Sequence, residues 1–131
     1  MAGESRHPRT TLLIGGRLVN VAGESHYQEA LREIVGPTTA AEIAVDTEAL
    51  LVPEPSNPHD PNAVMVQIDG KLVGYLPRDE AAAYGPALNE LGERGRMGSC
   101  EARIAGRGGD GGTSNLGVFL RLPDPEEPNH E

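Results

Sequence analysis

The sequence predicts a mainly β fold, a small barrel of about six strands with two short helices. Short runs of aliphatic and β-branched residues recur along the chain between glycine and proline turns, in the order strand, helix, three strands, helix, two strands. Only two segments carry an apolar stripe at helical spacing. The chain contains three Tyr, one Phe and no Trp, so its core must consist mainly of Val, Leu, Ile and Ala. Such a core suits a small barrel better than a large cleft enzyme.

The first elements follow from glycines and a capping pattern. Residues 11–21 predict a strand with a bulge or break at Gly15-Gly16. Ser25, three residues before Gln28, forms a capping-box pattern, which predicts a helix whose first amides are capped by the Ser25 side chain. Gly36-Pro37 ends that helix. Its apolar stripe consists of Tyr27, Leu31 and Ile34.

The middle of the chain predicts a hairpin behind a stiff loop. Residues 42–52 form a long, bent strand, and four prolines make the loop over 53–62 rigid. Asp69-Gly70 tolerates the positive φ angles of a type I′ turn and joins strands 63–68 and 71–76. Alternation directs one set of side chains into the barrel, namely Val64, Val66 and Ile68.

The last third predicts a helix and two strands. Tyr84, Leu88 and Leu91 share a helical face, and Pro86 is expected to split this helix into two halves. Strands 97–106 and 116–122 follow, joined by a glycine-rich loop. The pattern Gly106-x-Gly108-x-x-Gly111 matches the dinucleotide-binding fingerprint literally, but a strand follows it instead of a helix, so we interpret it as a flexible hairpin loop.

Length and composition set the domain limits. A 131-residue chain fits one compact domain, which we expect over residues 11–123. Residues 1–10 are polar and predict a disordered tail, whereas residues 124–131 contain four acidic residues and no Lys or Arg, which predicts a solvated, proline-rich tail. No stretch resembles a signal peptide or a membrane span, so we expect a soluble, cytoplasmic protein that does not bind membranes.

Candidate catalytic and metal-binding groups are sparse. Cys100 is the single cysteine, which excludes an intramolecular disulfide and any zinc site that needs two thiolates of this chain. No two histidines have the i, i+4 metal spacing, and neither a nucleophile elbow nor a Walker A loop occurs. The sequence therefore predicts no enzyme, no cofactor and no metal. His26 and His59 could meet only through folding, and the default interpretation is two solvated histidines.

Three motifs together resemble the HIRAN domain family. They are PEPSNPHDPNAV at residues 53–64, GKLVGYLPR at 70–78 and GESHYQ at 23–28. The resemblance extends from about Leu18 to Leu122. It implies an OB-like barrel, found at the N-terminus of DNA-remodelling ATPases and alone in bacterial proteins. In the studied branch of the family, the domain captures the free 3′ end of single-stranded DNA.

Carried over by motif, the resemblance implies a nucleic-acid-binding site. The contact positions would be Ser25 and His26 at the helix start, with Tyr27 beside them, and His59 and Asp60 in the proline-rich loop. Asp60 would accept a hydrogen bond from the terminal hydroxyl. The DNA-binding branch has an arginine where Ser25 stands and tyrosines where His26 and His59 stand, so a phosphate contact is lost while an imidazole can still stack on a base.

Three functions remain open. The first is a nucleic-acid-binding module for single-stranded DNA ends that serves repair or remodelling, with a DNA-processing protein as a candidate partner. The second is a protein-interaction module, which the net charge of −9 favours. The third is an accessory part of a nucleic-acid hydrolase. A rim of cations around Asp60 would favour nucleic acid and an acidic rim would favour protein; the candidate cations are Arg17, Lys71, Arg78 and Arg103.

Overall fold

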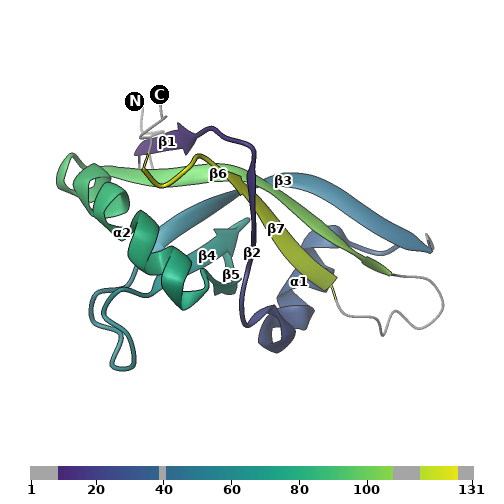
Figure 1. The fold of residues 1–131 in the computed structure, drawn as a ribbon. Coiled ribbons are helices and arrows are strands. Elements are labelled where there is room, and N and C mark those ends of the chain that lie inside the picture. The colour runs from purple at the N-terminus through teal and green to yellow at the C-terminus, as the bar shows by residue number, and fades with distance from the viewer. Residues whose placement is uncertain (1–8, 39–40, 108–115, 127–131) are drawn as a thin grey trace, which may run out of the picture.

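The computed structural model describes residues 9–38, 41–107 and 116–126 (Figure 1). The elements in chain order are β1 (Arg9–Leu13), β2 (Arg17–Asn20), the 3-10 helix η1 (Glu24–Tyr27), α1 (Gln28–Val35), β3 (Glu42–Pro53), β4 (Val64–Ile68), β5 (Lys71–Tyr75), α2 (Arg78–Glu93), β6 (Arg96–Arg107) and β7 (Leu116–Leu122). The predicted mainly β fold with two helices is confirmed. Strand β1 begins two residues before the expected start of the domain. The glycine-rich loop, residues 1–8 and residues 127–131 lie outside the described residues.

Six strands form the barrel, in the hydrogen-bonded order β2-β7-β6-β3-β4-β5. All of these neighbours are antiparallel. Ala22, just after β2, exchanges two backbone hydrogen bonds with Tyr75 of β5, at 2.7 and 2.9 Å, which joins the two ends of the sheet. A Cβ on Gly74 would collide with the Val21 side chain and lie 2.7 Å from the Ala22 carbonyl oxygen. Glycine is required there because the closing strands approach closely.

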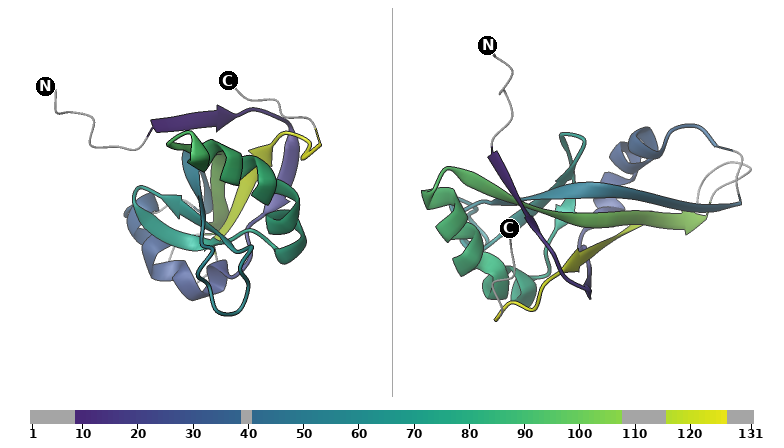
Figure 2. Two further views of the ribbon diagram at one scale, coloured as in Figure 1. Left: turned by 90° about the vertical axis from the view of Figure 1, so that its left-hand side faces the viewer. Right: turned by 90° about the horizontal axis from the view of Figure 1, so that it is seen from above.

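The predicted break at Gly15-Gly16 is confirmed, and it separates β1 from β2. Strand β1 pairs parallel with the first half of β6, whereas β2 pairs with β7. Where the chain passes between these two positions, a Cβ on Gly15 would overlap the backbone of Leu122 and Pro123. Figure 2 shows β1 crossing over the barrel at β6.

The predicted type I′ hairpin is confirmed. Asp69 and Gly70 have φ angles of 54° and 75°, and they connect β4 to β5. The three inward positions of β4 are buried, at no more than 1% exposure: Val64, Val66 and Ile68. They belong to one aliphatic core, to which the two helices contribute Leu31, Ala81, Tyr84, Leu88 and Leu91.

The predicted Ser25 cap is wrong. The first turn is a 3-10 helix that starts from Gly23, where the His26 N–H bonds the Gly23 carbonyl at 3.0 Å, and no side chain caps η1 or α1. The Gln28 side chain instead binds β7: its Oε1 accepts from the Leu116 N–H at 2.7 Å, and its Nε2 donates to the Leu116 carbonyl at 2.9 Å. A long-range contact therefore takes the place of the local capping box.

The predicted split of the second helix at Pro86 is also wrong. Helix α2 runs without interruption over 16 residues, with Pro86 inside it. Proline removes one backbone hydrogen bond and disfavours a helix interior. Here Tyr84 and Leu88 on either side of it are buried against the barrel, and we attribute the continuity of the helix to this packing. None of the helices in the described ranges has the length and apolar character needed to cross a membrane.

Candidate nucleic-acid interface

Two segments meet at Tyr75, the last residue of β5. One is η1, and the other is the loop of residues 54–63 between β3 and β4, here called the proline loop. The Tyr75 backbone pairs with Ala22 just before η1, while its hydroxyl donates to Glu54 Oε1 at 3.3 Å. Burial and the neighbouring Glu54 carboxylate raise the pKa of Tyr75, so its hydroxyl stays protonated and donates at neutral pH.

The proline loop is held by its own polar side chains. Asn57 Nδ2 donates to Glu54 Oε1 at 2.8 Å, and Asn57 Oδ1 accepts from the backbone N–H groups of His59 and Asp60 at 2.8 and 3.0 Å. Asp60 Oδ1 accepts from the Asn62 N–H at 2.9 Å. Such Asx-type bonds to backbone N–H groups are typical of Asn and Asp that precede proline in turns. They fix the backbone around His59 and leave its imidazole exposed.

The second carboxylate oxygen of Asp60 faces a cation. Arg78, the first residue of α2, places Nε 3.6 Å from Asp60 Oδ2 and donates from Nη2 to the His59 carbonyl at 3.4 Å. The Arg78 side chain is 77% exposed, whereas that of Asp60 is 19% exposed. A carboxylate has about four acceptor positions. Asp60 can therefore accept a further hydrogen bond while Arg78 remains open to an anion.

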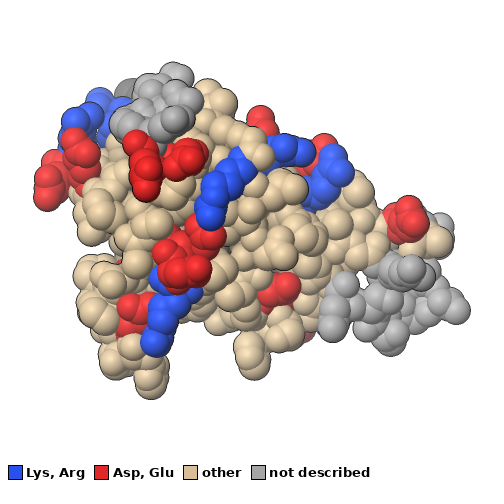
Figure 3. All heavy atoms as spheres, in the orientation of Figure 1, with Lys and Arg blue, Asp and Glu red and all other residues tan. Residues whose placement is uncertain are grey.

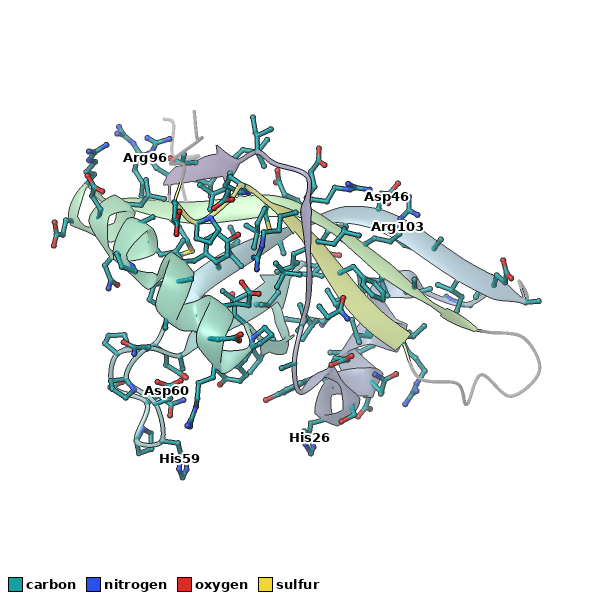
Figure 4. All side chains as sticks on the ribbon, in the orientation of Figure 1. His26, Asp46, His59, Asp60, Arg96 and Arg103 are labelled. Carbon is teal, nitrogen blue, oxygen red and sulfur yellow. The ribbon has the colours of Figure 1, made fainter. Side chains whose placement is uncertain are left out.

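The structure places the five predicted site residues in two groups. His59 and Asp60 lie together in the proline loop, and Ser25, His26 and Tyr27 lie together on η1. Ser25 and His26 are exposed, and Tyr27 is half-buried. In Figure 4, His26 and His59 both project away from the barrel on its lower side. No hydrogen bond or ion pair between described residues joins the two groups directly, and Tyr75 contacts the segments that carry them.

Tyr75 was not predicted as a site residue, and Arg78 was predicted only as one of four candidate cations around Asp60. Both stand in the GKLVGYLPR motif, so the motif itself was the signal. The motif spans the end of β5 and the start of α2. These positions become part of the site only because the proline loop folds against them.

Of the four candidate cations, Arg78 is the one at Asp60. Each of the other three is paired with an acidic residue elsewhere: Arg17 with Glu80 at 2.7 Å, Lys71 with Glu33 at 3.2 Å, and Arg103 with Asp46 at 2.7 Å. On the face drawn in Figure 3, Lys and Arg side chains alternate with Asp and Glu and form no continuous basic surface. Among the described residues, Arg78 is thus the cation paired with Asp60, and Asn57 links Asp60 to the Glu54 carboxylate.

The part of the chain that the structure describes contains few groups that could serve in catalysis. No three His, Cys, Asp or Glu side chains there gather as a metal site would require. Cys100 is buried in β6, and burial raises the pKa of its thiol to about 12. A thiol in that state is a poor nucleophile at neutral pH.

Comparison with protein-family models matches residues 16–119 to the HIRAN domain. The chain belongs to the HIRAN domain family. The HIRAN domain is a nucleic-acid-binding module, and it is a binding domain and not a catalytic one. Among solved structures, the crystal structure of the HIRAN domain of human HLTF is similar, with 24% identity over 87% of this chain and 81% of that chain and a TM-score of 0.37. A comparison with curated proteins found no match.

Proposed function

We propose that this HIRAN protein binds the end of a single-stranded DNA that carries a free 3′-hydroxyl. The site consists of η1 and the proline loop, with Ser25, His26, Tyr27, His59 and Asp60 as contact residues. We further propose that it acts in the cytoplasm as an accessory to a DNA-processing protein in repair or remodelling. Family membership supports the ligand class, and the resemblance of the loop motifs supports the end preference.

The observation that carries the proposal is the pairing of Asp60 with Arg78. A terminal hydroxyl can donate to the Asp60 carboxylate, while Arg78 can reach a phosphate of the same strand because its side chain is mostly exposed. A 3′-phosphate would remove the donor and place a second negative charge beside Asp60. Arg78 also supplies the cation that is missing at Ser25, where the DNA-binding branch has arginine.

Base stacking supplies most of the expected binding energy. The exposed imidazoles of His26 and His59 offer flat faces to unstacked bases. Stacking of a base on an aromatic side chain contributes ~1 to 3 kcal/mol. The net charge of −9 opposes a polyanion, so we expect a Kd on the order of 10 to 100 μM.

Fluorescence anisotropy with matched oligonucleotides tests the proposal. A short labelled strand ending in a 3′-hydroxyl should bind more tightly than the same strand ending in a 3′-phosphate. Repeating the titration at two salt concentrations should give a shallow slope, since each neutralised phosphate adds about 0.7 for single strands and we expect one or two such contacts. Equal binding of both ends, or no binding at millimolar protein, would refute end capture.

A further inference from the structure

The first half of β3 has an unpaired edge. Strand β3 pairs with β6 from Glu42 to Leu51, but with β4 only from Leu50 to Pro53. No other backbone hydrogen bond between described residues involves positions 42–49. In Figure 2, β3 and β6 run together beyond the shorter strands, with β7 on the opposite side of β6 from β3. One edge of this segment therefore offers free main-chain donors and acceptors.

The register identifies the groups on this edge. The Glu54 N–H donates to the Ala63 carbonyl, so Glu54 faces the β4 side of the strand. Main-chain groups alternate between the two edges along a strand, and the pairing of β3 shows no bulge. The N–H and C=O groups that face the free edge are therefore those of Glu42, Ala44, Asp46 and Glu48.

The side chains along this edge differ between the two faces of the sheet. On the outer face all four side chains are exposed, and three are acidic: Glu42, Asp46 and Glu48. On the inner face Ile43 and Val45 are half-buried and pack against the core. A strand added here would place alternate side chains beside carboxylates and beside an apolar surface.

Charge pairing within the sheet leaves Glu48 without a cation opposite it. Asp46 is bound by Arg103, which lowers the pKa of the Asp46 carboxyl. Glu48 stands directly across from Glu101 on β6. Like charges at directly opposed positions destabilise a sheet. A cationic side chain on an added strand would relieve this repulsion.

We propose that the free edge of β3 binds an extended basic peptide as an additional strand. The peptide alternates Lys or Arg, which face the acidic residues, with aliphatic residues, which face Ile43 and Val45. A second copy of the chain fits poorly, because an antiparallel pair of β3 edges centred on Val45 would bring Glu42 against Glu48. A nucleic-acid strand would meet the same carboxylates. This proposal does not depend on DNA-end binding.

The test uses the whole protein and a synthetic peptide of seven residues that alternates Lys and Val. Binding is followed by NMR of backbone amides and by anisotropy of a labelled peptide. We expect shifts at the amides of Ala44, Asp46 and Glu48. Methylation of the peptide N–H groups that face β3 should abolish binding, because main-chain donors supply the pairing. This control leaves the protein unchanged.

Two protein variants complete the test. Ala44→Pro removes an N–H that faces the free edge and leaves every hydrogen bond between β3 and β6 in place. It should therefore prevent peptide binding, while circular dichroism shows an intact fold. Glu48→Gln should weaken binding by up to about fivefold, whereas Glu93→Gln at the end of α2 should not. The proposal is overturned if the methylated peptide or an alternating Glu-Val peptide binds equally well. Shifts at η1 and the proline loop instead of β3, or no binding at millimolar peptide, would also overturn it.

Discussion

Arg78 Nε lies 3.6 Å from Asp60 Oδ2, and this pair joins the first turn of α2 to the proline loop. Exposed ion pairs contribute only about 0 to 1 kcal/mol to stability. The pair matters for position, because it sets an acceptor and a cation side by side at the end of the barrel. In this HIRAN protein the pair is the observation on which the proposal of DNA-end capture rests.

Replacing His59 or His26 by Ala should weaken single-stranded DNA binding more than replacing Arg78 by Ala. Under the proposed function each imidazole would stack on a base, worth ~1 to 3 kcal/mol, whereas Arg78 would make one phosphate contact. Anisotropy titrations of the three variants measure the ranking, and Arg78→Ala should lower the salt slope by about 0.7. His59→Phe is the matched control, since it retains a flat ring. A larger loss for Arg78→Ala than for both histidine variants would contradict the stacking account.

Asn57→Ala should loosen the proline loop. The change removes one donor and one acceptor that together make three hydrogen bonds, so we expect a loss of about 1 to 2 kcal/mol in the free energy of unfolding and weaker DNA binding. Urea unfolding measures the first effect. Asn89→Ala, at an exposed position of α2, is the control and should change neither quantity. An Asn57→Ala protein that matches the wild type in both would show that the loop does not need these bonds.

Gln28→Ala should destabilise the protein, and Ser25→Ala should not. Gln28 makes two hydrogen bonds to the Leu116 backbone, and their removal leaves half-buried main-chain groups unpaired at a cost of about 1 to 3 kcal/mol. Thermal melts of the two variants make the comparison. Equal melting midpoints for wild type and Gln28→Ala would contradict the stabilising role of the Leu116 contact. A lower midpoint for Ser25→Ala alone would support the capping box.

These residues show where sequence reasoning succeeds and where it fails. The Asp69-Gly70 hairpin and the break at Gly15-Gly16 follow from local backbone preferences, and the sequence predicts both. The prediction of a capping box was wrong because the Gln28 side chain binds Leu116, a partner 88 positions away. The prediction that Pro86 splits the second helix was wrong, and we attribute this to tertiary packing that outweighs a local preference.

The site shows the same division. The motifs indicated His59 and Asp60 as site residues, and the bonds of Asn57 and Asp60 to nearby backbone are local ones that these residue types favour. The pair between Asp60 and Arg78 depends on how the proline loop packs against α2, and no local pattern encodes that contact. The free edge of β3 could likewise not be predicted from the sequence, because it depends on where the pairing between β3 and β4 stops.

Alkaline pH should destabilise the wild type more than Cys100→Ala. Burial raises the pKa of the folded thiol from 9.0 to about 12. Above pH 9 the unfolded thiol therefore loses its proton while the folded thiol keeps it, so the free energy of unfolding falls as pH rises toward 12. The slope from this group reaches at most about 1.4 kcal/mol per pH unit.

Urea unfolding between about pH 8 and pH 11 measures how the free energy of unfolding depends on pH in the wild type and in Cys100→Ala. The raised pKa values of Tyr75 and Tyr84 act in the same direction in both proteins, so the difference in slope isolates the thiol. Cys100→Ala also leaves a small cavity that lowers stability at every pH, which shifts its curve without changing the slope. Parallel curves would refute the buried, protonated thiol.

The most direct test of DNA-end capture compares Asp60→Asn with the wild type for two oligonucleotides that differ only in a 3′-hydroxyl or a 3′-phosphate. Asparagine keeps the Oδ1 acceptor that holds the Asn62 N–H, so the loop should persist. We expect the wild type to prefer the hydroxyl end by about tenfold or more, as a hydrogen bond to a charged group implies, and the variant to bind both ends almost equally. A wild type without preference, or a variant that keeps the full preference, would contradict the role of Asp60.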